Sequence, residues 1–202
     1  MEKFTTLTAT AVPLPYSSID TDQLIPARFM SRTRAQGYGD LLLADRRAEP
    51  GFPLENPRYA GARIMVARRN FGSGSSREAA VYALVDAGIR CVIAPSFGDI
   101  FAANAANNGL LAAAVSEDQA EELLAAVQDD RPELSVDLDA CLINSQMGFT
   151  IEPVARMKLL RGWDDFDLTS SHMATIAAFA GDHAIRRPWT IPYSSKTPGT
   201  AS

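Results

Sequence analysis

The sequence is poor in the residues that hold metals and covalent crosslinks. Its 202 residues include two cysteines, Cys91 and Cys141, and two histidines. The cysteines form no CxxC pair, which argues against a zinc site or a disulfide scaffold. An iron–sulfur cluster needs three or four thiolates, so this chain alone cannot supply its ligands. Cys91 lies in the apolar run "IRCVIAP", and we expect a buried small hydrophobe rather than a reactive thiol.

Long apolar runs and long basic runs are missing too. No stretch approaches the about 20 apolar residues of a membrane-spanning helix. The first residues lack the basic region and apolar core of a secretory signal. The net charge is -5, and basic pairs such as Arg68-Arg69 are scattered, which disfavours nucleic-acid binding. We therefore expect a cytoplasmic protein that binds neither membranes nor nucleic acids.

The composition is that of an ordinary globular chain, with 47% hydrophobic and 21% charged residues. Apolar β-prone runs alternate with helical patterns over residues 63–130, which predicts β-α-β units and a parallel sheet. Because β-prone segments flank this region, we expect an α/β fold with a mixed, mostly parallel sheet or a small barrel flanked by helices. We predict one domain over residues 1–202, with its core at about 4–184 and a loose tail at 185–202.

The stretch "RRNFGSGSSREAA", residues 68–80, joins a predicted strand to a predicted helix. Open sheets bind ligands at this end of their strands. The stretch fits neither of the two familiar nucleotide-binding patterns. Arg77 stands at the third glycine position of GxGxxG, and the stretch has no lysine that could serve in GxxxxGK[ST]. Ser75 and Glu78 have the spacing of a capping box, so either Ser75 or Ser76 can cap the helix. A purely structural turn therefore stays open.

The same turn gathers groups that favour an anion. Ser75, Ser76 and Arg77 lie where backbone N–H groups and the helix dipole attract negative charge. Gly72 and Gly74 have no side chain to block the close approach of a ligand. Arginine pairs with a planar carboxylate through two hydrogen bonds. These residues predict a site for a small carboxylate.

Three motifs, in this order, resemble the swivelling domain of the aconitase superfamily: "IDTDQLIPARFM", "NFGSGSSREAA" and "CVIAPSFGDIFAANAANNGLL". The resemblance covers roughly residues 20–179. Within the superfamily, chain length and motif order are similar to those of the isopropylmalate dehydratase small-subunit family. The resemblance implies a swivelling β/β/α domain and a hydro-lyase that dehydrates and rehydrates a hydroxy di- or tricarboxylic acid.

The resemblance also implies roles for the residues of the glycine-rich turn. Ser75 corresponds to the catalytic base of the family, a serine whose alkoxide needs a helix N-terminus, N–H groups and an arginine to stabilise it. Ser76 and Arg77 correspond to residues that bind a substrate carboxylate.

Three further residues take their expected roles from the resemblance. Asp22, in the "DTD" motif, matches an active-site aspartate that contributes to substrate binding, although an Asx turn also explains it. Arg32 and Arg34 lie where the family has a substrate-reading loop. One of them, with Arg34 favoured, is expected to contact the distal carboxylate of the substrate, and an exposed loop arginine is the alternative.

The chemistry of the family uses a [4Fe–4S] cluster with one open iron as a Lewis acid. Since two cysteines are too few for it, the resemblance implies that this chain binds no metal or cofactor. It implies instead a heterodimer with a large subunit that carries the cluster.

Two positions depart from the family pattern. Ser73 stands where members usually have cysteine, and Ala79 stands where they usually have histidine. The departures leave open a related hydro-lyase acting on citraconate, methylmalate or homoaconitate. They also leave open a partner protein that binds a carboxylate without catalysis.

Overall fold

The computed structural model describes residues 1–129 and 132–190. Its contacts divide the chain into two compact units, Met1–Asp164 and Asp165–Ser202. Within the described residues, every buried position lies in the first unit. The expected single domain with a core at 4–184 stays a prediction. Residues 191–202 of the expected loose tail lie outside the described residues.

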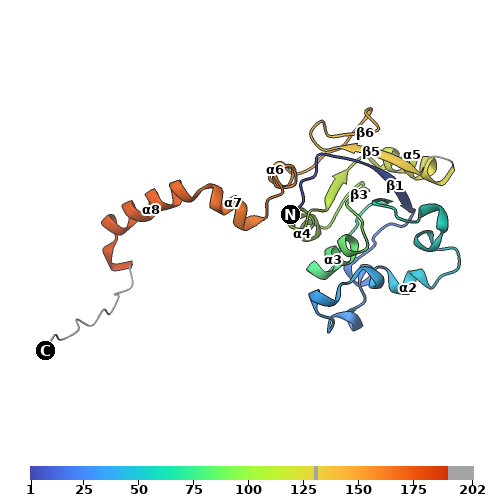
Figure 1. The fold of residues 1–202 in the computed structure, drawn as a ribbon, viewed down its shortest axis with the longest axis horizontal. Helices are drawn as coiled ribbons and strands as arrows, with labels where there is room; N and C mark the ends of the chain where they lie inside the picture. The colour runs from blue at the N-terminus through green and yellow to red at the C-terminus, as the bar shows by residue number, and fades with distance from the viewer. Residues whose placement is uncertain (130–131, 191–202) are drawn as a thin grey trace. The chain divides into compact units, whose positions relative to one another are not determined.

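A seven-stranded mixed sheet forms the centre of the first unit (Figure 1). Its strand order is β4-β3-β2-β1-β5-β6-β7. Strands β1 to β4 are parallel to one another, and β1, β5, β6 and β7 pair in antiparallel fashion. The predicted α/β class with a mixed sheet is confirmed. The strands are β1 (Thr6–Leu14), β2 (Ile64–Ala67), β3 (Cys91–Ala94), β4 (Leu111–Ala114), β5 (Glu133–Asp137), β6 (Leu142–Ile143) and β7 (Met147–Gly148).

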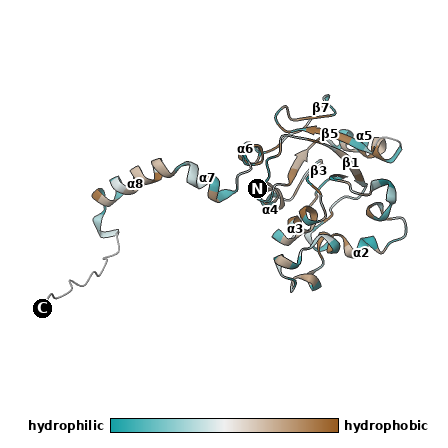
Figure 2. Cartoon of the chain, in the orientation of Figure 1, coloured by the Kyte–Doolittle hydropathy of each residue, from teal (hydrophilic) through white to brown (hydrophobic). Residues whose placement is uncertain are grey.

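Helices cover the parallel part of the sheet. Helix α3 (Glu78–Asp86) connects β2 to β3, helix α4 (Asp99–Asn107) connects β3 to β4, and helix α5 (Glu117–Asp129) packs on β1, β2 and β3. Figure 1 shows α5 on one side of the strands and α3 and α4 on the other. Strands β2 and β3 are buried at every position, as parallel strands covered on both faces are, and Figure 2 shows the hydrophobic colour of the sheet.

Cys91 is fully buried in β3, as expected for a small hydrophobe. Burial raises the pKa of its thiol, because desolvation disfavours the thiolate. A reactive role for this thiol is therefore disfavoured.

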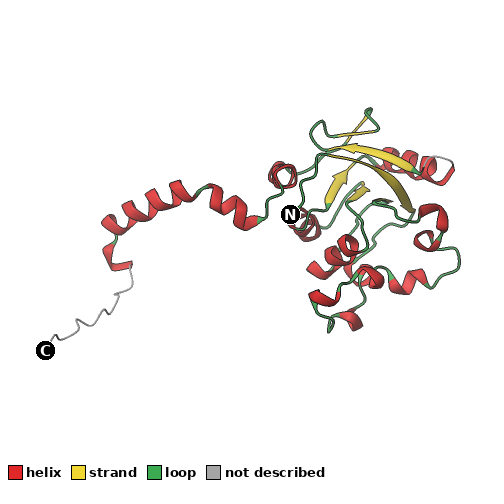
Figure 3. Cartoon of the chain, viewed as in Figure 1, coloured by secondary structure: helices red, strands yellow, loops and turns green. Residues whose placement is uncertain are grey.

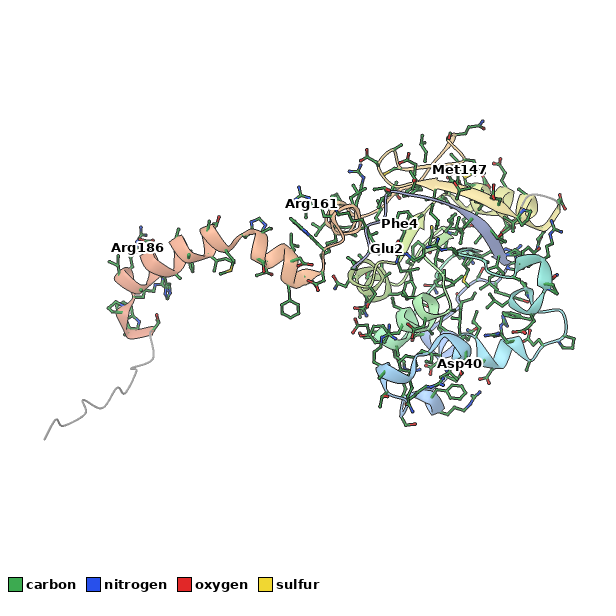
Figure 4. All side chains as sticks on the ribbon, in the orientation of Figure 1. Glu2, Phe4, Asp40, Met147, Arg161 and Arg186 are labelled. Atoms are coloured by element: carbon green, nitrogen blue, oxygen red, sulfur yellow. The ribbon has the colours of Figure 1, made fainter. Side chains whose placement is uncertain are left out.

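The long connection from β1 to β2 contains only short helical pieces (Figure 3). It holds α1 (Thr21–Leu24), α2 (Ala44–Arg47) and five 3-10 turns between Ala27 and Tyr59. Asp40 in this connection and Met147 in β7 lie at opposite ends of the first unit (Figure 4). Helix α6 (Pro153–Arg161) is the last helix of the first unit. Its N-cap residue, Glu152, accepts a hydrogen bond from the N–H of Ala155 at 2.8 Å.

The second unit, described for residues 165–190, contains α7 (Asp165–Ser171), α8 (Met173–Arg186) and a 3-10 turn at Pro188–Thr190. Among the described residues, no helix of either unit has the length and apolarity to cross a bilayer.

Candidate functional site

Three loops meet at the carboxyl ends of β1, β2 and β3. The loop after β2 lies between the other two and is hydrogen-bonded to both of them. The N–H of Gly72 donates to the carbonyl of Ile19 at 2.7 Å, and the N–H of Phe71 donates to the carbonyl of Ser96 at 3.0 Å. These bonds place residues 68–77 at the edge of the sheet where open α/β folds bind ligands.

Phe71 anchors the glycine-rich turn to the core. Its ring is fully buried and meets Phe97 and Phe101 edge to face, with ring centroids 6.3 and 5.4 Å apart. Gly72 follows with φ at +70°, and a Cβ there would lie 2.2 Å from the ring of Phe101. Gly74 has φ at +94°. Both glycines are therefore required by backbone conformation, and Gly72 also by space.

Helix α3 starts without a side-chain cap, so the capping predicted from Ser75 and Glu78 is wrong. The helix begins at Glu78, Arg77 is the N-cap residue, and no side chain accepts from the first turn. The Glu78 carboxylate instead accepts a hydrogen bond from Asn108 at 3.0 Å. The spacing suits a capping box, but the helix starts only at Glu78, and Thr21 bonds the carbonyls of Ser73 and Ser75 in the turn before it. The N–H groups of this turn are therefore not taken up by a serine.

The start of α3 lines a pocket of about 170 Å³. Ser75 and Ser76 are exposed, and Arg77 is half-buried. Hydroxyls, a guanidinium and the positive end of a helix thus share one small cavity, which suits a carboxylate. The lining residues are Thr21, Gly72, Gly74, Ser75, Ser76, Arg77, Gly98, Asp99, Ile100, Phe101 and Asn104.

Asp22 reaches this site through Arg77. The guanidinium of Arg77 donates to the carboxylate of Asp22, and the two form an ion pair. Asp22 does not line the pocket itself. An arginine has five N–H donors, so this pair leaves donors of Arg77 available to a ligand.

Arg32 and Arg34 are not brought into the pocket lining. Arg32 donates to Asp40 at 2.7 Å, and this hydrogen bond lowers the pKa of the Asp40 carboxyl. Arg34 donates to Asp86 at 2.5 Å, and its guanidinium lies 4.4 Å from the centre of the Tyr82 ring. Both side chains are held by partners on the surface, and their roles in binding substrate stay predictions.

Three pocket residues with polar side chains were not among the predicted site residues. Asp99 and Asn104 lie on α4 and come close because α4 follows the neighbouring strand. Thr21 is the first residue of α1 and precedes the predicted Asp22. Asp99 adds one negative charge to the wall of the pocket, opposite in sign to the positive charge of Arg77. All three lie within the motifs that resemble the family, but their distance from Ser75 in the sequence gives no sign that they share its pocket.

A larger and more open depression of about 680 Å³ lies between α5 and the short strands β6 and β7. The charged residues of its lining are Glu122 and Glu133. Carboxylates disfavour an anionic ligand, so the smaller pocket at α3 is the better candidate for a carboxylate site.

The family described as Aconitase C-terminal domain matches residues 1–118 of the chain. The match includes all three loops and the start of α3. The chain belongs to this family.

Similar proteins within this family are small subunits of 3-isopropylmalate dehydratase. The one from Acidothermus cellulolyticus is 45% identical over 197 residues, with 94% of this chain and 98% of the relative covered. The one from Micrococcus luteus is 41% identical over 197 residues, with 95% and 98% covered. The resemblance found in the sequence motifs is confirmed.

A solved structure of 3-isopropylmalate dehydratase from Methanocaldococcus jannaschii matches with a TM-score of 0.63. It is 24% identical, and the match covers 86% of this chain and 98% of that chain. This likeness confirms the fold.

Proposed function

We propose that this chain is the small subunit of a 3-isopropylmalate dehydratase, which interconverts 2- and 3-isopropylmalate in leucine biosynthesis in the cytoplasm. The observation that carries the proposal is the uncapped start of α3, where two serines and an arginine line one pocket. The names of the relatives support the substrate, since they are small subunits of that enzyme.

Ser75 is the proposed base of the reaction. It removes a proton from the carbon next to a substrate carboxylate, and it returns that proton when water is added back. A serine is a very weak base, so its alkoxide needs strong electrostatic stabilisation. The free N–H groups and dipole of α3 and the positive charge of Arg77 supply it at this position.

Arg77 and Ser76 are the proposed donors to a substrate carboxylate. The ion pair with Asp22 holds the guanidinium of Arg77 in place while its remaining N–H groups stay available. We assign the distal carboxylate to the loop of Arg32 and Arg34. To reach it, Arg34 exchanges its bond to Asp86 for one to the substrate.

The residues of this chain do not fit an iron–sulfur cluster. Its two thiols are fewer than a cluster requires, and Cys91 is fully buried. Within the described residues, no group of three or more His, Cys, Asp or Glu side chains suits a metal. We therefore assign the cluster, and the Lewis-acid polarisation of the substrate hydroxyl, to a large subunit in a heterodimer.

Reconstitution with the large subunit tests the proposal. The full chain and a large subunit are purified anaerobically, and conversion of 2-isopropylmalate to 3-isopropylmalate is followed by chromatography. We expect conversion by the mixture and none by either protein alone. Citraconate and homoaconitate are offered in parallel. An intact complex that converts only one of those acids, or no acid, contradicts the proposal.

A further inference from the structure

Thr21 is a buried polar residue that makes two hydrogen bonds to the turn of Ser75. It is 2% exposed. Its N–H donates to the carbonyl of Ser73 at 2.9 Å, and its hydroxyl donates to the carbonyl of Ser75, also at 2.9 Å. The two bonds hold alternate carbonyls of one short segment, so this segment has a defined orientation against α1.

The hydroxyl bond joins residues 54 positions apart in the sequence. A threonine in a helical turn commonly bonds within its own element. Thr21 bonds instead to the segment that carries the serines, and its hydroxyl lies 3.6 Å from the position that a Cβ on Gly74 would take. This distance is an ordinary van der Waals contact, so α1 packs directly against this turn, and Gly74 is required there by its positive φ rather than by space.

The geometry of the peptide group gives this bond a consequence. The peptide between Ser75 and Ser76 is trans, so its carbonyl and its N–H point in opposite directions. Because Thr21 holds the carbonyl toward α1, the N–H of Ser76 points away from α1. No acceptor for this N–H is found among the described residues.

We propose that Thr21 is a positioning residue of the dehydratase reaction. Its hydroxyl fixes the Ser75–Ser76 peptide so that the Ser76 N–H is offered to the negative charge that develops at Ser75 and the substrate. The inference rests on the proposed function, because it takes Ser75 as the base. It adds that the correct orientation of the turn is imposed from α1 and not by a cap on α3.

Thr21→Val tests the proposal, because valine keeps the shape of threonine and removes the hydroxyl. In the reconstituted complex we expect kcat to fall about 10- to 100-fold, less than for direct loss of a transition-state donor, with KM within about 3-fold of wild type. Thr21→Ser, which restores the donor, should return kcat to within about 3-fold. Thr150→Val is the matched control, since the Thr150 hydroxyl also donates to a carbonyl, that of Ala114.

A second measurement does not depend on activity. In the full chain alone, amide hydrogen exchange at Thr21 and Gly72, whose N–H groups donate across the two loops, should be about 10-fold faster in Thr21→Val than in wild type and unchanged in Thr150→Val. If Thr21→Val does not fold, Thr21→Ala takes its place in both measurements.

The outcomes separate the two proposals. An inactive wild-type complex contradicts the proposed function, and the exchange measurement then decides whether Thr21 holds the turn. An active wild-type complex with wild-type kcat in Thr21→Val overturns the role of Thr21. A change in KM alone, or no rescue by serine, also overturns it.

Discussion

The starts of α5 and α3 carry the same local pattern and have different structures. At α5, Ser116 and Gln119 form a complete capping box, with reciprocal hydrogen bonds of 3.2 and 2.9 Å. At α3, Ser75 and Glu78 have the same spacing and no side-chain cap is made. Sequence spacing shows that a cap is possible. Whether the cap forms depends on what else holds the chain.

The difference teaches how a protein keeps hydroxyls available at a helix start. At α5 the cap stabilises the helix directly. At α3 the rings of Phe71, Phe97 and Phe101 and the bonds from Thr21 replace the cap. Stability at α3 thus comes from tertiary packing, and the serines stay free for a ligand. Four substitutions test this comparison, beginning with the largest expected effect.

Ser75→Ala should reduce kcat of the reconstituted complex by about 10³-fold or more, because it removes the proposed base. The thermal unfolding midpoint of the chain should stay within about 1 °C of wild type, because Ser75 caps nothing. Isomerisation assays and thermal unfolding check the two expectations. Full activity in Ser75→Ala would falsify the assignment of the base.

Gly72→Ala should lower the free energy of unfolding by about 3 kcal/mol, through the positive φ and the clash with the ring of Phe101. Chemical denaturation measures it. Gly51→Ala is the control, since Gly51 also has positive φ, at +77°, but nothing lies within 4 Å of its added Cβ. Equal losses in the two variants would mean that the Phe101 contact does not anchor the turn.

Arg77→Lys should lower kcat/KM about 30-fold, because lysine keeps the charge and loses the fork that binds Asp22 and a carboxylate together. Steady-state kinetics of the complex measure this. Arg68→Lys is the matched control, because Arg68 makes a two-bond pair with Glu121 on α5, at 2.6 and 2.9 Å. A similar fall in both variants would point to a general loss of stability instead.

Ser116→Ala should have the smallest effect, a loss of about 1 kcal/mol from the missing cap. The thermal midpoint should fall by about 2–4 °C, and activity should not change. Together with Ser75→Ala this gives a reciprocal pair: one serine serves stability and the other serves activity. If Ser75→Ala destabilises the chain as much as Ser116→Ala does, then α3 is capped in solution.

The sequence predicts the parallel half of the fold well because each element carries its own signals. The runs of β2, β3 and β4 are apolar, and Gly88 and Gly109 with positive φ end the helices between them. The antiparallel part was less predictable. This part has three short strands, because Cys141, Asn144 and Ser145 turn the chain with positive φ. Positive φ is uncommon for residues other than glycine, so the sequence does not indicate turns at these positions.

The candidate site was predictable to the extent that its residues are contiguous. Ser75, Ser76 and Arg77 follow from the glycine-rich turn and the helix behind it. The pair between Arg77 and Asp22, and the bonds from Thr21, join segments more than 50 residues apart. No periodicity or spacing reports such contacts. The resemblance drew attention to Asp22 but not to Thr21, because a buried hydroxyl between two carboxylates has no distinct pattern.

The hydrogen bonds between the three loops also bear on the order of folding. The bonds from Gly72 to Ile19 and from Phe71 to Ser96 close chain loops of different lengths, and the longer loop joins segments as far apart in sequence as the paired residues of β1 and β2. Contacts between residues distant in sequence form late, because the entropy of loop closure is lost before they contribute. We therefore expect the ligand-binding turn to be completed together with the pairing of β1 and β2, and later than the helices, whose contacts are local. A nascent or partly unfolded chain would then have its helices before it has a competent site.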